Sequence, residues 1–283
     1  MIDLSQLSPM MQHYMETKKE YPDCVLFYRL GDFYEMFFDD ALTVSKELEI
    51  TLTGKDCGLS ERAPMCGVPF HALDSYLYRL VQKGYKVAIA EQMEDPRQAK
   101  GLVKREVIRV VTPGTITSSQ VLDETKNNYL MGIVYMDGIY GISTADISTG
   151  DFMVTEVDSD RELFDEINKF SPSEIICNNA FYMSGVDMDE LKNRYQVVIS
   201  ALDSRFFGEE SCRRILMEHF KVGALVGLGL EDYATGIIAA GAVMQYIYET
   251  QKSTLEHITT ITPYSTGQYM VIDTSTRRNR SEE

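Results

Sequence analysis

The pattern of apolar and polar positions in residues 1–112 predicts a mixed α/β unit. Ser8 followed by Pro9 predicts the start of a helix, because serine is a favoured N-cap and proline fits the first helical position. The apolar run at 24–30 predicts a buried strand. Beyond it, apolar positions that recur every three or four residues as far as Leu48 predict a second helix.

The start of this second helix has an ordinary local explanation. Gly31 ends the strand, Asp32 is a suitable N-cap, and Glu35 stands three residues later, where a capping-box partner belongs. The remaining elements expected in this unit are a strand at 50–53, an irregular segment at 54–69, a helix from about 71 to 83 ended by Gly84, and strands at 86–91 and 106–111.

A second unit is predicted from Tyr129 onward. Three strand-like runs are separated by Asp137-Gly138 and by Thr149-Gly150, which are typical hairpin turns. After these three strands (130–136, 139–147 and 151–157) we expect a helix at 160–170, strands at 173–177 and 196–201, and helices near 204–221 and 231–251. Three antiparallel strands followed by alternating helices and strands is the order of an RNase H-like α/β fold.

Local composition separates the two units. Residues 113–128 are rich in proline, glycine, threonine, serine and asparagine, which is typical of a linker. We therefore expect domains at 1–112 and 129–251. Residues 258–283 resemble a strand with a polar tail that forms no core, so 252–283 are expected to begin a further domain that the chain contains only in part.

Composition restricts the classes of function. The formal net charge of −16 argues against a general nucleic-acid binder. The charge is uneven, however: residues 1–112 have a net charge of −3 and residues 113–283 one of −13, so the first half is the better candidate for DNA contact. No apolar run approaches the roughly 20 residues of a membrane span. No secretory signal is evident, and five scattered cysteines favour reduced thiols in a cytosolic protein.

Six collinear segments resemble the MutS family of bacterial DNA mismatch repair proteins. They are 26–41 (LFYRLGDFYEMFFDDA), 64–72 (PMCGVPFHA), 87–96 (VAIAEQMEDP), 109–115 (RVVTPGT), 146–150 (DISTG) and 276–279 (TRRN). The resemblance implies a mixed-sheet mismatch-recognition domain, an RNase H-like connector domain, and the start of a core or lever domain in 252–283. The chain itself lacks the P-loop pattern, so no ATPase activity and no cofactor are expected for it.

The resemblance also implies properties of the full-length family protein. That protein uses ATP and Mg²⁺, forms a homodimer in the bacterial cytoplasm and contacts the repair factor MutL through the connector domain. The resemblance further implies that Phe33 enters mismatched double-stranded DNA from the minor groove as a wedge, while Glu35 contacts the displaced base. Wedge insertion requires unstacking, which costs less where base pairing is already broken.

Each candidate DNA-contact residue also has a structural explanation. Phe33 could instead belong to the core, and Asp32 with Glu35 could be only a capping box. The resemblance places Lys55, Pro64 and Met65 in a loop against the minor groove, but a solvated surface loop is the alternative. Arg105 and Arg109 stand at alternate positions of one strand, where they share a face and could meet phosphates or only water.

Two other classes of function remain open. The first is a metal-dependent nuclease of the RNase H-like fold, with Asp137, Asp146 and Asp151 as candidate ligands, because such a site needs several carboxylates to hold two metals. The second is an interaction scaffold without DNA contact, in which the acidic second half recruits a protein partner.

Overall fold

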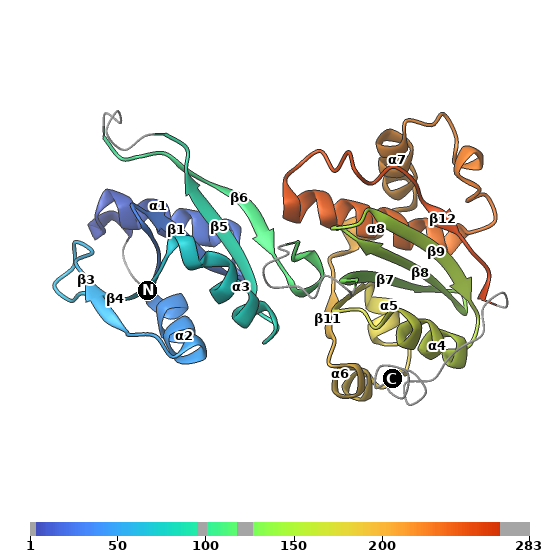
Figure 1. Ribbon diagram of the computed structural model, residues 1–283, viewed down its shortest axis with the longest axis horizontal. Coiled ribbons are helices and arrows are strands. Elements are labelled where there is room, and N and C mark those ends of the chain that lie inside the picture. The colour runs from blue at the N-terminus through green and yellow to red at the C-terminus, as the bar shows by residue number, and fades with distance from the viewer. Residues whose placement is uncertain (1–3, 95–100, 118–126, 267–283) are drawn as a thin grey trace, which may run out of the picture. The chain divides into compact units, whose positions relative to one another are not determined.

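The computed structural model describes residues 4–94, 101–117 and 127–266. The chain divides into two compact units, Met1–Leu122 with Thr250–Lys252 and Asp123–Glu249 with Ser253–Glu283. Each unit contains a mixed sheet covered by helices (Figure 1). The predicted α/β fold class is therefore confirmed for both units.

The first unit is built on a sheet with the strand order β3-β4-β2-β1-β5-β6. Its elements are η1 (Leu4–Gln6), α1 (Pro9–Glu20), β1 (Cys24–Leu30), β2 (Phe33–Phe37), α2 (Phe38–Leu48), β3 (Thr53–Lys55), β4 (Ala63–Pro69), η2 (Phe70–Ala72), α3 (Leu73–Val81), β5 (Lys86–Gln92), β6 (Arg105–Val111) and η3 (Pro113–Thr115). The central strand β1 is parallel to β5 and antiparallel to β2. The strand predicted at 24–30 and the helix start at Pro9 are confirmed.

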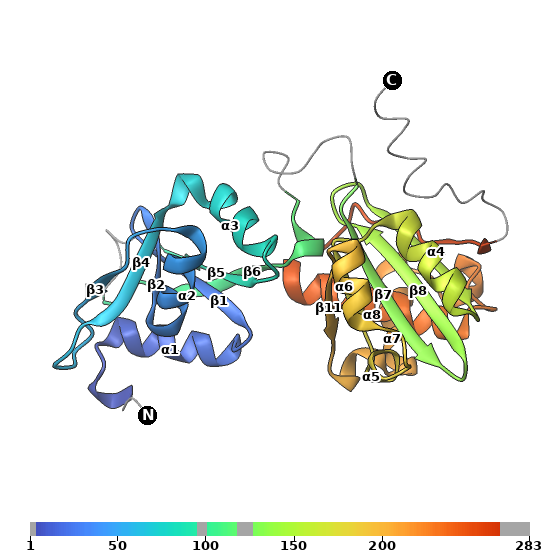
Figure 2. The same cartoon turned by 90° about the horizontal axis from the view of Figure 1, so that it is seen from below.

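Both faces of this sheet are covered, which explains why β1 is almost continuously apolar. Alternate residues of β1 point to opposite faces: Phe27 packs with α2 and α3, whereas Leu26 packs with α1. Figure 2 shows α1 on one side of the sheet and α3 on the other. The sheet is therefore packed between two layers of helices.

A buried carboxylate joins the helices to the sheet. Asp40 accepts hydrogen bonds from the Tyr14 hydroxyl (3.2 Å) and the Leu26 backbone amide (2.9 Å), and forms an ion pair with Lys18 (2.9 Å). Burial raises the pKa of the Tyr14 hydroxyl, and the nearby Asp40 carboxylate raises it further. Asp40 therefore ties α1, β1 and α2 together through satisfied polar contacts.

The second unit has the strand order β11-β10-β7-β8-β9-β12. Its elements are β7 (Tyr129–Met136), β8 (Ile139–Asp146), β9 (Asp151–Val157), α4 (Asp160–Phe170), β10 (Glu174–Cys177), α5 (Asn179–Tyr182), α6 (Met188–Tyr195), β11 (Val198–Ala201), η4 (Ser204–Phe207), α7 (Glu209–Phe220), η5 (Leu225–Leu228), α8 (Ala234–Gln251) and β12 (Thr262–Pro263). Strands β7, β8 and β9 form an antiparallel meander, and β10 and β11 continue the sheet in parallel with β7. This is the predicted RNase H-like arrangement. The short helices α5 and α6 were not predicted.

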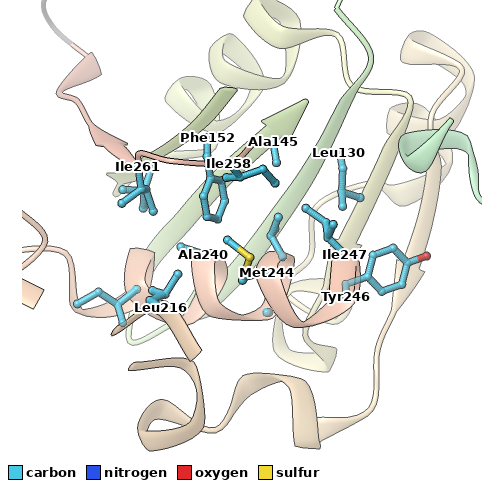
Figure 3. Close-up of a cluster of buried hydrophobic side chains, with 14 of the residues drawn as sticks. Leu130, Ala145, Phe152, Leu216, Ala240, Met244, Tyr246, Ile247, Ile258 and Ile261 are labelled. Carbon is cyan, nitrogen blue, oxygen red and sulfur yellow. The ribbon is translucent and has the colours of Figure 1, made fainter. Parts of the chain in front are cut away.

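The long helix α8 packs closely on this sheet through small residues. Figure 3 shows apolar side chains of the sheet, such as Leu130 and Phe152, facing Met244 and Ile247 of α8. A Cβ added at Gly141 of β8 would lie 2.4 Å from the backbone of Thr235, so a side chain there has no room. The glycine therefore sets the distance between helix and sheet.

Three sequence predictions about local structure are wrong. Residues 33–37 form the strand β2, and the helix begins only at Phe38. Consequently Asp32 and Glu35 do not form a capping box. The segment 54–69 is irregular only at 56–62, because the residues on either side of that stretch pair as β3 and β4. These residues extend the sheet, which satisfies backbone groups that an irregular segment would leave to water.

The boundary predicted at residue 251 also differs from the structure. Leu255, Ile258 and Ile261 are buried in the core of the second unit, and β12 pairs in parallel with β9. The described part of the segment expected to begin a further domain thus packs onto the second unit, since its apolar residues complete that core. At the other boundary, Pro113–Thr115 are buried and Ile116 joins the core of the first unit, so the start of the predicted linker is packed.

Among the residues that the structure describes, no helix combines the length and the apolar character that crossing a membrane requires.

Candidate nucleic-acid interface

An exposed aromatic side chain follows the turn between β1 and β2. Leu30 lies opposite Phe33 in the antiparallel pair, so only Gly31 and Asp32 form the turn. Gly31 has a φ of 58°, which glycine adopts without strain. Phe33 is 47% exposed, although phenylalanine is usually buried. Phe33 therefore projects from the protein, and its alternative placement in the core is wrong.

Glu35 shares a face of the sheet with Phe33, because side chains two residues apart in a strand point the same way. Its carboxylate Oε2 lies 2.5 Å from the Nζ atom of Lys55, and the side chains are 16% and 34% exposed respectively. Gly67 lies directly opposite Glu35 in β4. A Cβ at Gly67 would come within 3.5 Å of Glu35 Cγ, so the glycine leaves the Glu35 side chain uncovered on that side.

The strand register separates Met65 from Pro64. Met65 lies opposite Phe37 and therefore on the same face as Phe33 and Glu35. Pro64 lies opposite Gly54 and points to the other face. The structure thus brings Phe33, Glu35, Lys55 and Met65 to one face of the sheet, which we call the Phe33 face.

The two candidate arginines of β6 do not share a face, contrary to the prediction. The register shifts by one residue between Ile89 and Ala90, which pair with Arg109 and Val107, so Ile108 is an extra bulged residue. Arg105 is only 7% exposed, and it donates from Nε to the Arg29 carbonyl oxygen at 2.7 Å. The bulge turns Arg109 to the opposite face, and no periodicity argument reveals such a bulge.

Arg109 lines a small cavity. The cavity holds about 10 Å³ and is lined by Arg109 together with Asp74, Tyr78 and Ile116, among others. Arg109 therefore lies beside α3, on the side of the sheet away from the Phe33 face.

Three residues that sequence reasoning did not select hold the turn before Phe33. The backbone amide of Gly31 donates to Gln92 Oε1 at 2.9 Å, and the amide of Phe70 donates to the Asp32 carbonyl oxygen at 2.9 Å. Arg29 donates from Nε to the Gly31 carbonyl oxygen at 2.5 Å. All three lie in segments that resemble the family, which is the one signal that could have identified them.

Asp146 and Asp151 lie opposite each other in β8 and β9, but both already accept hydrogen bonds, and Asp137 lies far from Asp146. Asp146 is buried and accepts hydrogen bonds from Asn128 N, Ser148 N and Ser148 Oγ at 3.0, 2.8 and 2.6 Å. Asp137 lies in the β7–β8 turn, at the other end of β8, which places it about 25 Å from Asp146 at roughly 3.3 Å per residue. Among the described residues, no group of three or more His, Cys, Asp or Glu side chains is arranged to hold a metal ion.

Comparisons with known proteins agree with this arrangement of two α/β units. Residues 8–120 match the family model described as MutS domain I, and residues 128–259 match the one described as MutS domain II. The fold and these matches define a pair of domains of the kind found in DNA mismatch repair proteins. The Phe33 face lies on domain I.

Proteins named DNA mismatch repair protein MutS are similar along nearly the whole chain. The chain is 62% identical to the one from Lachnoclostridium phytofermentans and 52% identical to the one from Acetivibrio thermocellus, with 98% of the chain covered in each case. It spans 30% and 32% of the length of these two relatives. The chain belongs to the MutS family and corresponds to the N-terminal domains I and II of its members.

Proposed function

We propose that this chain recognises mismatched or unpaired bases in double-stranded DNA, with Phe33 as the inserted wedge. The observation that carries the proposal is the exposed ring of Phe33 on a turn that is tied down on several sides. An apolar side chain pushed between base steps must unstack them, and this costs a few kcal/mol. The cost is smaller where pairing is already defective, so the wedge tests local stability of the duplex rather than its sequence.

Glu35 has a different task in this proposal. A carboxylate near DNA is repelled by phosphates, so its presence on the Phe33 face needs a purpose. We assign it the hydrogen bond to the displaced base, with Lys55 holding the carboxylate in place before DNA is bound. Met65 lies on the same face and adds apolar contact. Pro64, Arg105 and Arg109 are left out of this contact set, because each lies on the other face or is buried.

The roles of the longer protein are part of the same proposal. The relatives are named for DNA mismatch repair, and the chain covers about 30% of their length. We propose that the full-length protein hydrolyses ATP with Mg²⁺, acts as a homodimer, and relays the recognition event through the second unit to MutL. The acidic surface implied by the net charge of −13 in residues 113–283 supports a protein partner, rather than DNA, for that unit.

Replacing Phe33 with alanine in the full-length protein tests the wedge. Binding to matched and mismatched duplexes should fall to a common affinity, because alanine has no ring to insert or stack. The free energy of unfolding should change by less than about 1 kcal/mol, since Phe33 is half exposed, whereas truncation of a core phenylalanine costs about 3–5 kcal/mol.

Leu42 offers a matched control, because it has the same exposed fraction of 47% but lies on α2. Leu42→Ala should leave both affinities unchanged. A Phe33→Ala protein that still prefers mismatched DNA, or one that loses several kcal/mol of stability, would contradict the proposal.

A further inference from the structure

The turn that presents Phe33 is more constrained than a two-residue hairpin requires. In a free hairpin the polar groups of Gly31 and Asp32 would face water. Here the Gly31 amide, the Gly31 carbonyl and the Asp32 carbonyl are all bonded, to Gln92, Arg29 and Phe70 respectively. These partners come from three different strands or strand ends, so the turn is fixed relative to the sheet.

Arg29 is the centre of these contacts. Its guanidinium lies over the ring of Phe70, with 4.2 Å from Cζ to the ring centroid, and its Nη1 lies 3.5 Å from Glu91 Oε1. The side chain is only 18% exposed. Glu91 is held in turn by the hydroxyl of Tyr34, and burial together with this carboxylate raises the pKa of that hydroxyl. A long side chain is thus immobilised by a ring, a carboxylate and a carbonyl.

We propose that Arg29 is a positioning residue for the wedge: it holds the Gly31-Asp32 turn so that the Phe33 ring is already oriented before DNA is met. This inference rests on the proposed function. Its physical basis is that a group fixed in its bound conformation loses less conformational freedom on binding. Arg29 itself is assigned no contact with a base.

Arginine suits this position for reasons that lysine does not share. The planar guanidinium stacks on an aromatic face and, through its fixed fork of donors, reaches a carbonyl and a carboxylate at once. An ammonium group carries the same charge but offers neither the plane nor the fork. Arg29→Lys therefore preserves the charge that attracts DNA and removes the device that holds the turn.

The expected effect is a loss of discrimination without a loss of general DNA binding. Ordering the backbone of one residue corresponds to about a tenfold factor in affinity. We therefore expect Arg29→Lys in the full-length protein to reduce the ratio of mismatch to matched-duplex affinity by about tenfold. Matched-duplex affinity should stay within about twofold, because the number of positive charges is unchanged.

A second measurement reports on the turn without DNA. Two hydrogen bonds tie the turn to its neighbours: the Gly31 amide donates to Gln92, and the Phe70 amide donates to the Asp32 carbonyl oxygen. Their hydrogen exchange should become faster in Arg29→Lys, while the melting temperature stays the same. An arginine that contacted DNA but did not hold the turn would change affinity and leave this exchange unaltered.

Two controls make the outcomes distinguishable. Arg213→Lys is the matched control, because Arg213 lies on α7 of the other unit in an ion pair with Glu209. It should change neither the affinity ratio nor the exchange. Gln92→Leu removes the acceptor of the Gly31 amide without touching Arg29, and it should reproduce the loss of discrimination. If Arg29→Lys proves unstable, Gln92→Leu takes its place as the test of whether fixing the turn matters for discrimination.

The inference is overturned if Arg29→Lys, or Gln92→Leu where the lysine variant is unstable, keeps either the wild-type affinity ratio or the wild-type exchange. Its failure is separable from that of the proposed function. If Phe33→Ala abolishes discrimination and Arg29→Lys does not, only the positioning role is wrong. If Phe33→Ala retains discrimination, the wedge itself is wrong, whatever Arg29 does.

Discussion

Removing the carboxylate of Glu35 should strengthen binding to matched DNA and make that binding more sensitive to salt. The 2.5 Å ion pair with Lys55 means that the lysine is engaged by the protein's own carboxylate. The pair is partly exposed, so its breakage costs at most about 1 kcal/mol of stability. In Glu35→Ala the ammonium group is released, and it becomes available to one phosphate of the DNA backbone.

The size of this effect follows from counterion release. One additional phosphate contact steepens the plot of log affinity against log salt concentration by about 0.9. A lost negative charge about 8–10 Å from a phosphate contributes a further ~0.4–0.5 kcal/mol in water. Together these changes predict a matched-duplex affinity about two- to fivefold higher at low salt, with a reduced preference for the mismatch.

Fluorescence anisotropy of labelled duplexes, measured with the full-length protein between about 50 and 200 mM salt, gives both the affinity and the slope. The double variant Glu35→Ala with Lys55→Met should return the slope to that of the parent, because it removes the released charge. The reasoning is refuted if Glu35→Ala weakens matched-duplex binding, or if its salt slope stays at the parental value.

Three further predictions concern stability and reactivity. Asp40→Ala should lower the free energy of unfolding in urea by about 3–5 kcal/mol, because it leaves Lys18 and the Leu26 amide without their partner; a loss below about 1 kcal/mol would contradict the role of this carboxylate. Gly141→Ala should lower the melting temperature of the second unit, since its Cβ would meet the backbone of Thr235 at 2.4 Å, whereas the control Gly223→Ala, with open space around it, should not. Burial raises the pKa of the Cys66 thiol to about 12, so at pH 8 the native chain holds it as an unreactive thiol; rapid labelling of Cys66 by a thiol reagent without unfolding would refute this.

The element types were predictable wherever periodicity and length agreed. The run at 24–30 is a strand and the pattern at 160–170 is a helix, as predicted, because both patterns are long and have clear boundary signals. Asp137-Gly138 is a hairpin turn with positive φ at both residues. These features depend on nearest neighbours in the sequence, and such features are visible in a single chain.

The position of Phe33 was harder, because Gly31-Asp32 suits two different structures. A glycine and an aspartate before an apolar period indicate a helix start, and the same dipeptide indicates a hairpin turn. The hairpin forms because β2 pairs with β1 on one side and with β4 on the other. The Phe33 ring is exposed in either structure. Phe33 therefore projects outward as a wedge requires, although the helix start predicted at this position is wrong.

The contacts around the turn could not be predicted from spacing. Arg29, Phe70 and Gln92 are distant in sequence and meet only through the order of the strands. The bulge at Ile108, which separates Arg105 from Arg109, has no proline or glycine to announce it. Similarly, the burial of Leu255 and Ile258 depends on where the chain after α8 returns to the sheet.

The length of the β1–β2 turn has a consequence for how this segment tolerates change. Because side chains alternate between the two faces, each added or deleted turn residue that shifts the pairing of β2 by one position exchanges its faces. After such a change, Tyr34 and Met36 would take the outward positions, and Phe33 and Glu35 would turn toward α2 and α3. The two-residue turn keeps the Phe33 ring and the Glu35 carboxylate outward. A turn with one residue more or fewer would turn both of them inward together, so the length of this connection cannot change by a single residue without loss of the Phe33 face.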